Sequence, residues 1–151
     1  MVSESGITAP ILVLGGIIGN QVPLFLRHDL TLTASSIEKL TQIDDAAKQM
    51  GVQAKVHLKI DTGMERIGVH YYNADSLLEA ALGCEHCLVE GIYSHFANAD
   101  TAVLQSAQTQ LDRFNHVLSF YDSRGLPAPP LRHMANSGAI LQLPGSHFDM
   151  V

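Results

Sequence analysis

A group of basic, imidazole, amide and hydroxyl side chains lies at the ends of three apolar segments. They are Lys59, Arg66, Tyr93, His95, His133, Asn136 and Ser137. A lysine and an arginine could bind an anion, and a histidine could hold or move a proton. The carboxyl ends of parallel strands meet at one edge of a sheet, and ligands bind there. If the three apolar segments are parallel strands, these residues form a candidate ligand site.

Each of these residues also has a purely structural interpretation. Lys59 lies within an apolar strand and could be an edge residue that reaches solvent, but a buried lysine must lose its charge or be paired. Arg66 could lie on the surface, and His95 could be a hydrogen-bonded structural histidine. The Asn-Ser-Gly string that starts at Asn136 is a common helix N-cap, and the free N–H groups of a helix start would also suit phosphate.

Strands are expected wherever the chain has a short run rich in Val, Ile and Leu. These runs show little alternation, which is typical of strands covered on both faces of a parallel sheet. The expected strands are Ile11–Leu14, Leu30–Thr33, Lys55–Ile60, Leu88–Ser94, Leu131–Ala135 and Phe148–Val151.

Helical patterns fill the segments between these strands. Ser35, with Glu38 three residues later, is a capping-box signature, and Gly51 ends the helix that follows. Further helices are expected at Asn20–Arg27, Ala74–Leu82 and Ala102–Ser123. This strand–helix repetition predicts a parallel sheet with helices outside, and periodicity leaves an open sheet and a closed barrel equally possible.

Composition excludes several classes of function. The chain has 151 residues, of which 46% are hydrophobic and 16% charged, with a net charge of −6. This is enough for one domain with a core, and the absence of a basic stretch argues against nucleic acid as a partner. No apolar run approaches the roughly 20 residues that cross a bilayer, and the first ten residues lack a secretory pattern. We therefore expect a cytoplasmic protein with no membrane partner.

The two cysteines, Cys84 and Cys87, lie in the string Cys-Glu-His-Cys. This spacing suits a redox or metal site, but a structural zinc site needs four ligands and the chain has no second cysteine pair. The pair falls between an expected helix and an expected strand. We therefore expect no metal site and no role for the pair.

Five ordered blocks together carry more information than any single residue. They are Gly6–Gly15, Lys59–Gly68, Gly91–Ala97, His133–Ala139 and Phe148–Val151. In order and separation they resemble the alanine racemase family, the fold-type-III pyridoxal phosphate enzymes built on a TIM-type (β/α)₈ barrel. The resemblance covers essentially the whole chain. It implies that residues 1–151 are an incomplete α/β barrel domain with about strands 3 to 8 of the family barrel, without the first two strands and the C-terminal β-domain.

The resemblance implies roles for the residues nearest the cofactor. Arg66 looks like the arginine that contacts the cofactor's phenolic oxygen and the substrate carboxylate. Lys59 looks like the lysine that is carbamylated in many members and then pairs with that arginine. His95 looks like the histidine packed beside the pyridine ring.

The resemblance also implies supporting roles. His133 and Asn136 would belong to a hydrogen-bond network behind the pyridine ring. Ser137 and the helix start after it would hold the cofactor phosphate. Tyr93 would support Arg66.

The implied activity is the interconversion of L-alanine and D-alanine, which supplies D-alanine for bacterial cell walls, by a homodimer that uses pyridoxal phosphate. Inversion needs an acid/base group on each face of the α-carbon. In the family these are a cofactor lysine in an Ala-Tyr-Gly-His-Gly string and a tyrosine of the C-terminal domain. Neither motif occurs in residues 1–151. We therefore expect no catalytic base on this chain and no racemisation by the chain alone.

Three alternatives stay open. The chain could be a non-catalytic, truncated relative, or belong to a racemase of another amino acid such as serine. It could also be a metal-dependent hydrolase with His95, His133, Asp100 and Asp149 as ligands.

Overall fold

The computed structural model describes residues 6–151 and contains one parallel sheet in the order β1-β2-β3-β5-β6, with β4 paired to β3. The strands are β1 (Leu12–Val13), β2 (Thr31–Ala34), β3 (Ala54–Asp61), β4 (Val69–His70), β5 (Cys87–Tyr93) and β6 (Leu131–His133). The helices are α1 (Val22–Arg27), α2 (Ile37–Met50), α3 (Ala74–Leu82), α4 (Gln105–Ser123) and α5 (Ser137–Gln142). Short 3₁₀ turns cover Gly19–Gln21, Tyr71–Asn73 and Pro144–Ser146.

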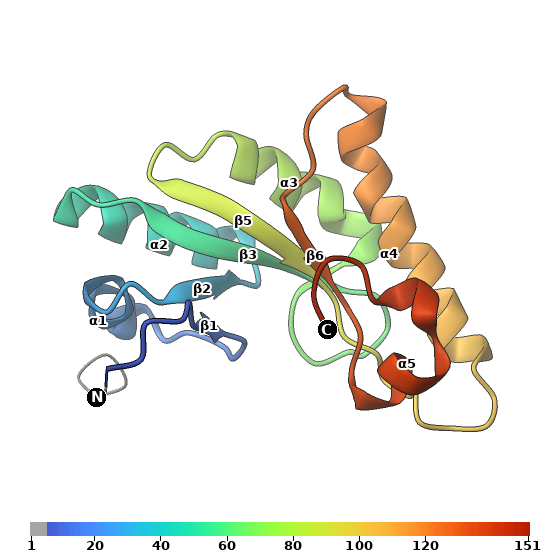
Figure 1. Ribbon diagram of the computed structural model, residues 1–151. Helices are drawn as coiled ribbons and strands as arrows, with labels where there is room; N and C mark the ends of the chain where they lie inside the picture. Colours follow the sequence, from blue (N-terminus) through green and yellow to red (C-terminus); the bar gives the residue numbers. More distant parts are fainter. Residues whose placement is uncertain (1–5) are drawn as a thin grey trace.

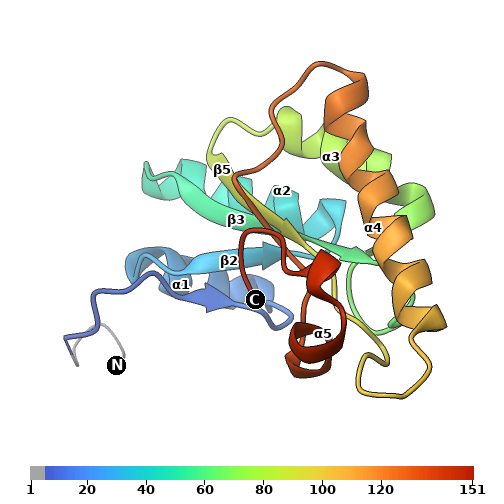
Figure 2. The same ribbon diagram turned by 45° about the vertical axis from the view of Figure 1, so that its right-hand side comes forward.

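The sheet is curved and forms a half-barrel. Figures 1 and 2 show α1 to α4 along one side of the strands, whereas α5 lies beyond the carboxyl end of β6. The core between sheet and helices is apolar: Leu58 and Ile60 of β3, Leu40 of α2 and Phe114 of α4 are all at most 1% exposed. Because one face of each strand is buried against helices, the other face is free to carry the polar residues of a barrel interior.

Strand β3 differs from the sequence-based expectation in its chemistry. It is buried almost throughout, as expected, but polar and apolar residues alternate along it. Val56, Leu58 and Ile60 join the apolar core, whereas His57 and Lys59 point to the opposite face. The polar side chains on that face contact one another. The alternation along β3 therefore reflects a polar interior and not a face exposed to solvent.

Helix α2 begins one residue later than the capping-box pattern predicts. Ser36, not Ser35, is the N-cap, and its Oγ accepts a hydrogen bond from the backbone N–H of Lys39 at 3.1 Å. The pairing of Ser35 with Glu38 is therefore wrong. Gly51 ends the helix as predicted, with a left-handed φ of 65°.

The strand expected at 148–151 is reduced to one parallel bridge between His133 and Met150. Phe148 has a φ of 47°, which interrupts the extended backbone that a longer strand would need. Asp149 instead accepts hydrogen bonds from the guanidinium and the backbone N–H of Arg132. Strand β4 was not anticipated, because two residues are too few to give a pattern.

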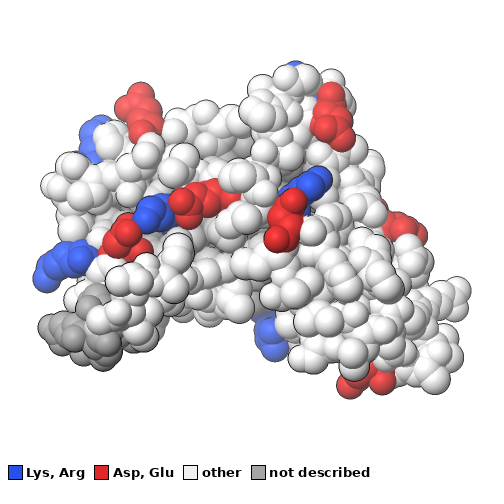
Figure 3. All heavy atoms as spheres, in the orientation of Figure 1, with Lys and Arg blue, Asp and Glu red and all other residues white. Residues whose placement is uncertain are grey.

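The surface agrees with the low charge content of the sequence. On the face drawn in Figure 3, acidic and basic side chains are interspersed among broad uncharged areas and form no basic patch. None of the helices within residues 6–151 combines the length and the apolarity that a bilayer crossing requires.

Candidate functional site at the carboxyl edge of the sheet

Three strands bring Lys59, Tyr93 and His133 side by side. Lys59 pairs in register with Tyr93, and Tyr93 pairs with His133. The Lys59 Nζ lies 4.9 Å from the centroid of the Tyr93 ring, and the Tyr93 and His133 rings stack with centroids 4.6 Å apart. The parallel registration therefore makes one continuous row of polar side chains near the carboxyl edge of the sheet.

His57 lies on the same face of β3 as Lys59, two residues earlier and one layer deeper below the carboxyl edge. The Nδ1 of His57 is 2.9 Å from Nε2 of His133, so the N–H of one ring donates a hydrogen bond to the lone pair of the other. Burial lowers the pKa of His57 to about 4. Burial, followed by the charges of His57 and Lys59, lowers the pKa of His133 to about 3. Both imidazoles are therefore neutral at neutral pH.

Tyr93 is held by strands on its other side. Its hydroxyl lies 2.9 Å from the Thr33 hydroxyl and donates to the backbone carbonyl of Leu14 at 3.2 Å. Thr33 in turn donates to the carbonyl of Val13 at 2.7 Å. These contacts with the segments of β1 and β2 fix the position of the Tyr93 ring. That Tyr93 supports Arg66 stays a prediction.

Lys59 is buried, with 3% of its surface exposed. Its Nζ donates to the carbonyl of Ile60 at 3.2 Å, and no carboxylate of residues 6–151 lies within ion-pair distance. Burial lowers the pKa of Lys59 to about 8; the charge of Asp61 opposes this shift and that of Arg66 adds to it. About a tenth of the amine is therefore neutral at pH 7, far more than for a lysine with the ordinary pKa.

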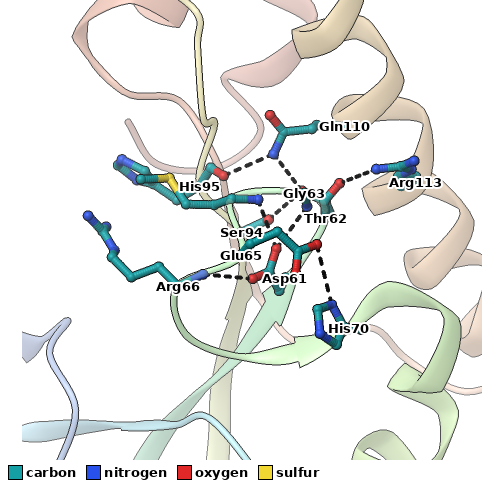
Figure 4. Close-up of polar contacts among 11 residues, drawn as sticks. Asp61, Thr62, Gly63, Glu65, Arg66, His70, Ser94, His95, Gln110 and Arg113 are labelled. Carbon is teal, nitrogen blue, oxygen red and sulfur yellow. Dashed lines mark hydrogen bonds and ion pairs between the residues drawn. The ribbon is translucent and has the colours of Figure 1, made fainter.

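Asp61 organises the loop that presents Arg66 (Figure 4). Its carboxylate accepts backbone N–H groups from Gly63 at 2.8 Å, Met64 at 2.9 Å and Arg66 at 3.2 Å. Burial alone raises the pKa of Asp61, but the N–H donors of the loop together hold it below its ordinary value. Arg66 itself is exposed, so its guanidinium is available to a ligand.

His95 follows β5 and faces the same region. Figure 4 shows its ring and the Arg66 side chain extending to the same side of the loop. Burial, then the positive charges of Lys59 and Arg66, lower the pKa of His95. The backbone around it is fixed by Gln110 of α4, which donates to the His95 carbonyl at 3.2 Å and accepts the N–H of Ala97 at 3.0 Å.

A cavity of about 260 Å³ opens beside His95. It is lined by Leu12, Leu14, Tyr93, Ser94, His95, His133, Met134, Ala135, Met150 and Val151. Arg66 lines a separate hollow of about 330 Å³ with Leu14, Gly15, Gly16 and Ile67. Because Leu14 borders both hollows, Arg66 and His95 face neighbouring parts of one mouth.

Asn136 and Ser137 lie at the start of α5. The Asn136 side chain accepts the N–H of Ala139 at 3.0 Å, which makes it the N-cap of this helix, and Ser137 is exposed. Neither residue lines the cavity beside His95, although Met134 and Ala135 directly before them do. The structure thus gathers Lys59, Arg66, Tyr93, His95 and His133 closely and places these two at the border.

Sequence reasoning missed His57 and the residues that brace the loops. Thr62 and Ser94 bring their hydroxyl oxygens within 2.7 Å of each other, and Gln110 and Arg113 bond to Thr62 from α4. His57 could have been found from its place two residues before Lys59, which puts both on one strand face. Gln110 carries no such signal, because a glutamine within a helix is ordinary.

The four residues considered for a metal-dependent hydrolase do not assemble. Asp149 accepts from Arg132 at 2.7 Å, and His133 bonds to His57. Among the described residues, none of the clusters able to hold an ion includes Asp100, Asp149, His95 or His133.

Several known alanine racemases are similar to this chain in sequence and in fold. The family profile for the alanine racemase N-terminal domain matches residues 1–151. Alanine racemase 1 of Oceanobacillus iheyensis is 39% identical over 151 residues, which are 99% of this chain and 40% of that protein.

Solved structures give the same result. An alanine racemase of Clostridium difficile 630 superposes with a TM-score of 0.92 at 31% identity, over 99% of this chain and 39% of that one. An alanine racemase of Streptomyces coelicolor A3(2) gives a TM-score of 0.86 at 35% identity, over 98% of this chain and 40% of that one. The chain spans about two-fifths of the length of these relatives. It belongs to the alanine racemase family, in the N-terminal domain.

Proposed function

We propose that the protein containing this chain interconverts L-alanine and D-alanine with pyridoxal phosphate. The observation that carries the proposal is the convergence of Lys59, Arg66 and His95 on one mouth, in a chain 39% identical to a curated alanine racemase. A Clostridium difficile relative has been solved in complex with cycloserine. Supply of D-alanine for cell walls, a cytoplasmic location and a homodimeric state complete the proposal.

The residues at this mouth fit pyridoxal phosphate. The cofactor is an anion with a flat aromatic ring, and the mouth offers the Arg66 guanidinium and the flat imidazole of His95 beside a cavity lined largely by apolar and aromatic groups. We assign Arg66 to the phenolic oxygen and the substrate carboxylate, because its fork of donors matches a carboxylate. We assign His95 to the face of the pyridine ring, and Ser137 to the phosphate.

Lys59 and Arg66 present an electrostatic problem, because each cation disfavours the charge of the other. A carbamate on Lys59 would solve it: the ammonium group first loses one proton to solvent, the neutral amine then attacks carbon dioxide, and a second proton leaves as the N–C bond forms, so that an anion replaces a cation. This anion would pair with Arg66 and fix the guanidinium. The lowered pKa of about 8 supports the proposal, because it leaves part of the Lys59 amine neutral and nucleophilic.

The neutral pair of His57 and His133 would keep the interior behind the cofactor free of added positive charge, and Asn136 would extend the network from the N-cap of α5. When bound, pyridoxal phosphate withdraws electrons from the α-carbon and makes its proton removable. We assign neither proton-transfer step to a residue of this chain, and the chain alone should not racemise alanine. If the chain instead came from a non-catalytic relative, the full-length protein that carries it would not racemise alanine either.

The test uses the full-length protein that carries this segment. We expect Arg66→Lys to lower kcat/KM for alanine by about a hundredfold, as loss of a fixed charge-stabilising donor does. Arg27→Lys on the exposed surface of α1 is the matched control and should leave kcat/KM unchanged. Equal activity of both variants would contradict the role of Arg66, and faster turnover of serine than of alanine by the wild type would contradict the substrate.

A further inference from the structure

A second cluster lies at the opposite edge of the sheet from the racemase site. Asp44 of α2, Cys84 after α3 and Cys87 at the first position of β5 come from three separate elements. A carboxylate oxygen of Asp44 and the two sulfur atoms all lie within 4.8 Å of one another. Since Tyr93 ends β5 and Cys87 begins it, the length of this strand separates the cluster from the cofactor mouth.

The loop between the two cysteines is folded around Asp44. The backbone N–H of His86 donates to Asp44 Oδ1 at 2.8 Å. The Nδ1 of His86 lies 3.9 Å from Asp44 Oδ2 and is buried with no hydrogen-bond partner. A buried nitrogen without a partner is costly, and within residues 6–151 this is the one side-chain polar atom in that condition. The His86 nitrogen that lacks a partner therefore lies beside the carboxylate of Asp44, the acidic candidate ligand.

We propose that Asp44, Cys84 and Cys87 bind a thiophilic divalent cation of the zinc type, with His86 Nδ1, which lies 3.9 Å from Asp44 Oδ2, as a candidate for the fourth ligand. Two cysteines separated by two residues form half of a structural zinc site, and carboxylate and imidazole are the other ligands that zinc accepts. The sequence offers no second cysteine pair, which is why a metal is not expected from spacing alone. The fold supplies the missing ligand from α2, forty residues away in the sequence.

A metal site fits these cysteines better than a redox site does. A redox-active Cys-x-x-Cys pair has a thiolate stabilised by a helix N-terminus or a neighbouring cation, whereas Cys87 begins a strand and Asp44 is an anion. Cys84 donates to the carbonyl of Ala80 at 3.5 Å, as a thiol does. On coordination both thiols would release their protons to solvent as two metal–sulfur bonds form. The bound cation would then tie α2 to the connection between α3 and β5.

The chain has only two cysteines, so any thiolate–metal signal reports this site alone. The experiment titrates Co²⁺ into the chelator-treated, reduced full chain and then displaces it with Zn²⁺. We expect a thiolate-to-cobalt charge-transfer band that saturates at one equivalent, is lost on addition of Zn²⁺ and is absent in Cys84→Ser.

Asp44→Asn separates a ligand from a bystander, because the amide oxygen can still accept the His86 N–H. We expect this variant to raise the Kd for Zn²⁺ at least tenfold, about the smallest effect of perturbing a metal site. Asp45→Asn, at an exposed position on the same helix, should leave the Kd unchanged. Circular dichroism confirms that each variant is folded.

Two results would overturn the site. One is the absence of a thiolate band in folded wild-type chain. The other is an equal Kd for Zn²⁺ in the Asp44→Asn and wild-type chains. None of these outcomes bears on alanine racemisation, so the two proposals fail independently.

Discussion

At the scale of single residues, the polar interior depends on two histidines that stay neutral. His57 and His133 are 2% and 8% exposed and bond only to each other through the ring nitrogens that face one another. Their pKa values of about 4 and about 3 lie below the ordinary 6.5. The folded chain therefore binds fewer protons than the unfolded chain between about pH 4 and pH 6.5.

This difference makes stability depend on pH. The contribution of the pair is complete above pH 6.5 and is lost as pH falls toward 4. We expect the free energy of unfolding to drop by roughly 1–2 kcal/mol per histidine between about pH 7 and pH 5. Urea unfolding at a series of pH values measures the slope.

The His57→Gln variant should show a shallower slope than wild type, and His116→Gln at an exposed position should not. A wild-type stability that is flat from about pH 7 to pH 5 would contradict the neutral pair.

Gly91 makes room for the same pair. A Cβ built on Gly91 would lie 2.5 Å from ring atoms of His57, closer than real contacts allow. We expect Gly91→Ala to destabilise the chain by roughly 1–3 kcal/mol, as overpacking does, in urea unfolding at neutral pH.

Gly15→Ala is the matched control, because its Cβ would meet nothing within 4 Å. We expect this control to be neutral or slightly stabilising. A Gly91→Ala chain as stable as the control would show that the His57 ring can move aside.

Residue identity was predictable where chemistry and strand position coincide. Lys59, Arg66 and His95 stand out because each lies in or after an apolar run. The structure gathers them at one edge of the sheet. Asp44 could not be predicted as a partner of the cysteines, because contact between α2 and the start of β5 is a tertiary property with no local signal.

At the scale of elements, the caps of α2 illustrate how one residue decides a helix boundary. Ser35 and Ser36 are both possible N-caps by composition, but only Ser36 accepts the Lys39 N–H. We expect Ser36→Ala to cost about 1 kcal/mol of unfolding free energy, the usual value of a cap. Ser35→Ala should change stability by less than about 0.5 kcal/mol, and thermal or urea unfolding distinguishes the two. If Ser35→Ala lowered the unfolding free energy more than Ser36→Ala, the capping box of Ser35 and Glu38 would be supported instead.

Element type was easier to predict than element ends. The helix at Ala74–Leu82 has the predicted bounds, since its apolar stripe starts and stops with the helix. The longest helix begins at Gln105 instead of Ala102. The irregular backbone after Pro144 could not be predicted, because the residue with the left-handed φ is Phe148 and not a glycine.

At the scale of the whole molecule, hydrophobic periodicity could not separate an open sheet from a barrel. What distinguishes them here is the second face of the sheet, where Tyr93 contacts Thr33, His57 and Lys59. Within residues 6–151 no second layer of helices covers this face. The same interior leads to the cavity beside His95 at one edge, while the cysteine cluster lies at the other. The proposed cofactor site and the proposed metal site would thus lie at opposite ends of the strands.

We propose that this chain holds pyridoxal phosphate in an alanine racemase and that proton transfer at the α-carbon needs groups outside residues 1–151. The most direct measurement compares the 151-residue chain with the full-length protein that carries it, each with pyridoxal phosphate and L-alanine, by the rate at which D-alanine forms. We expect rapid interconversion by the full-length protein and only the rate of free cofactor with the shorter chain. A full-length protein that produces no D-alanine, or a shorter chain that turns over above free cofactor, would contradict it.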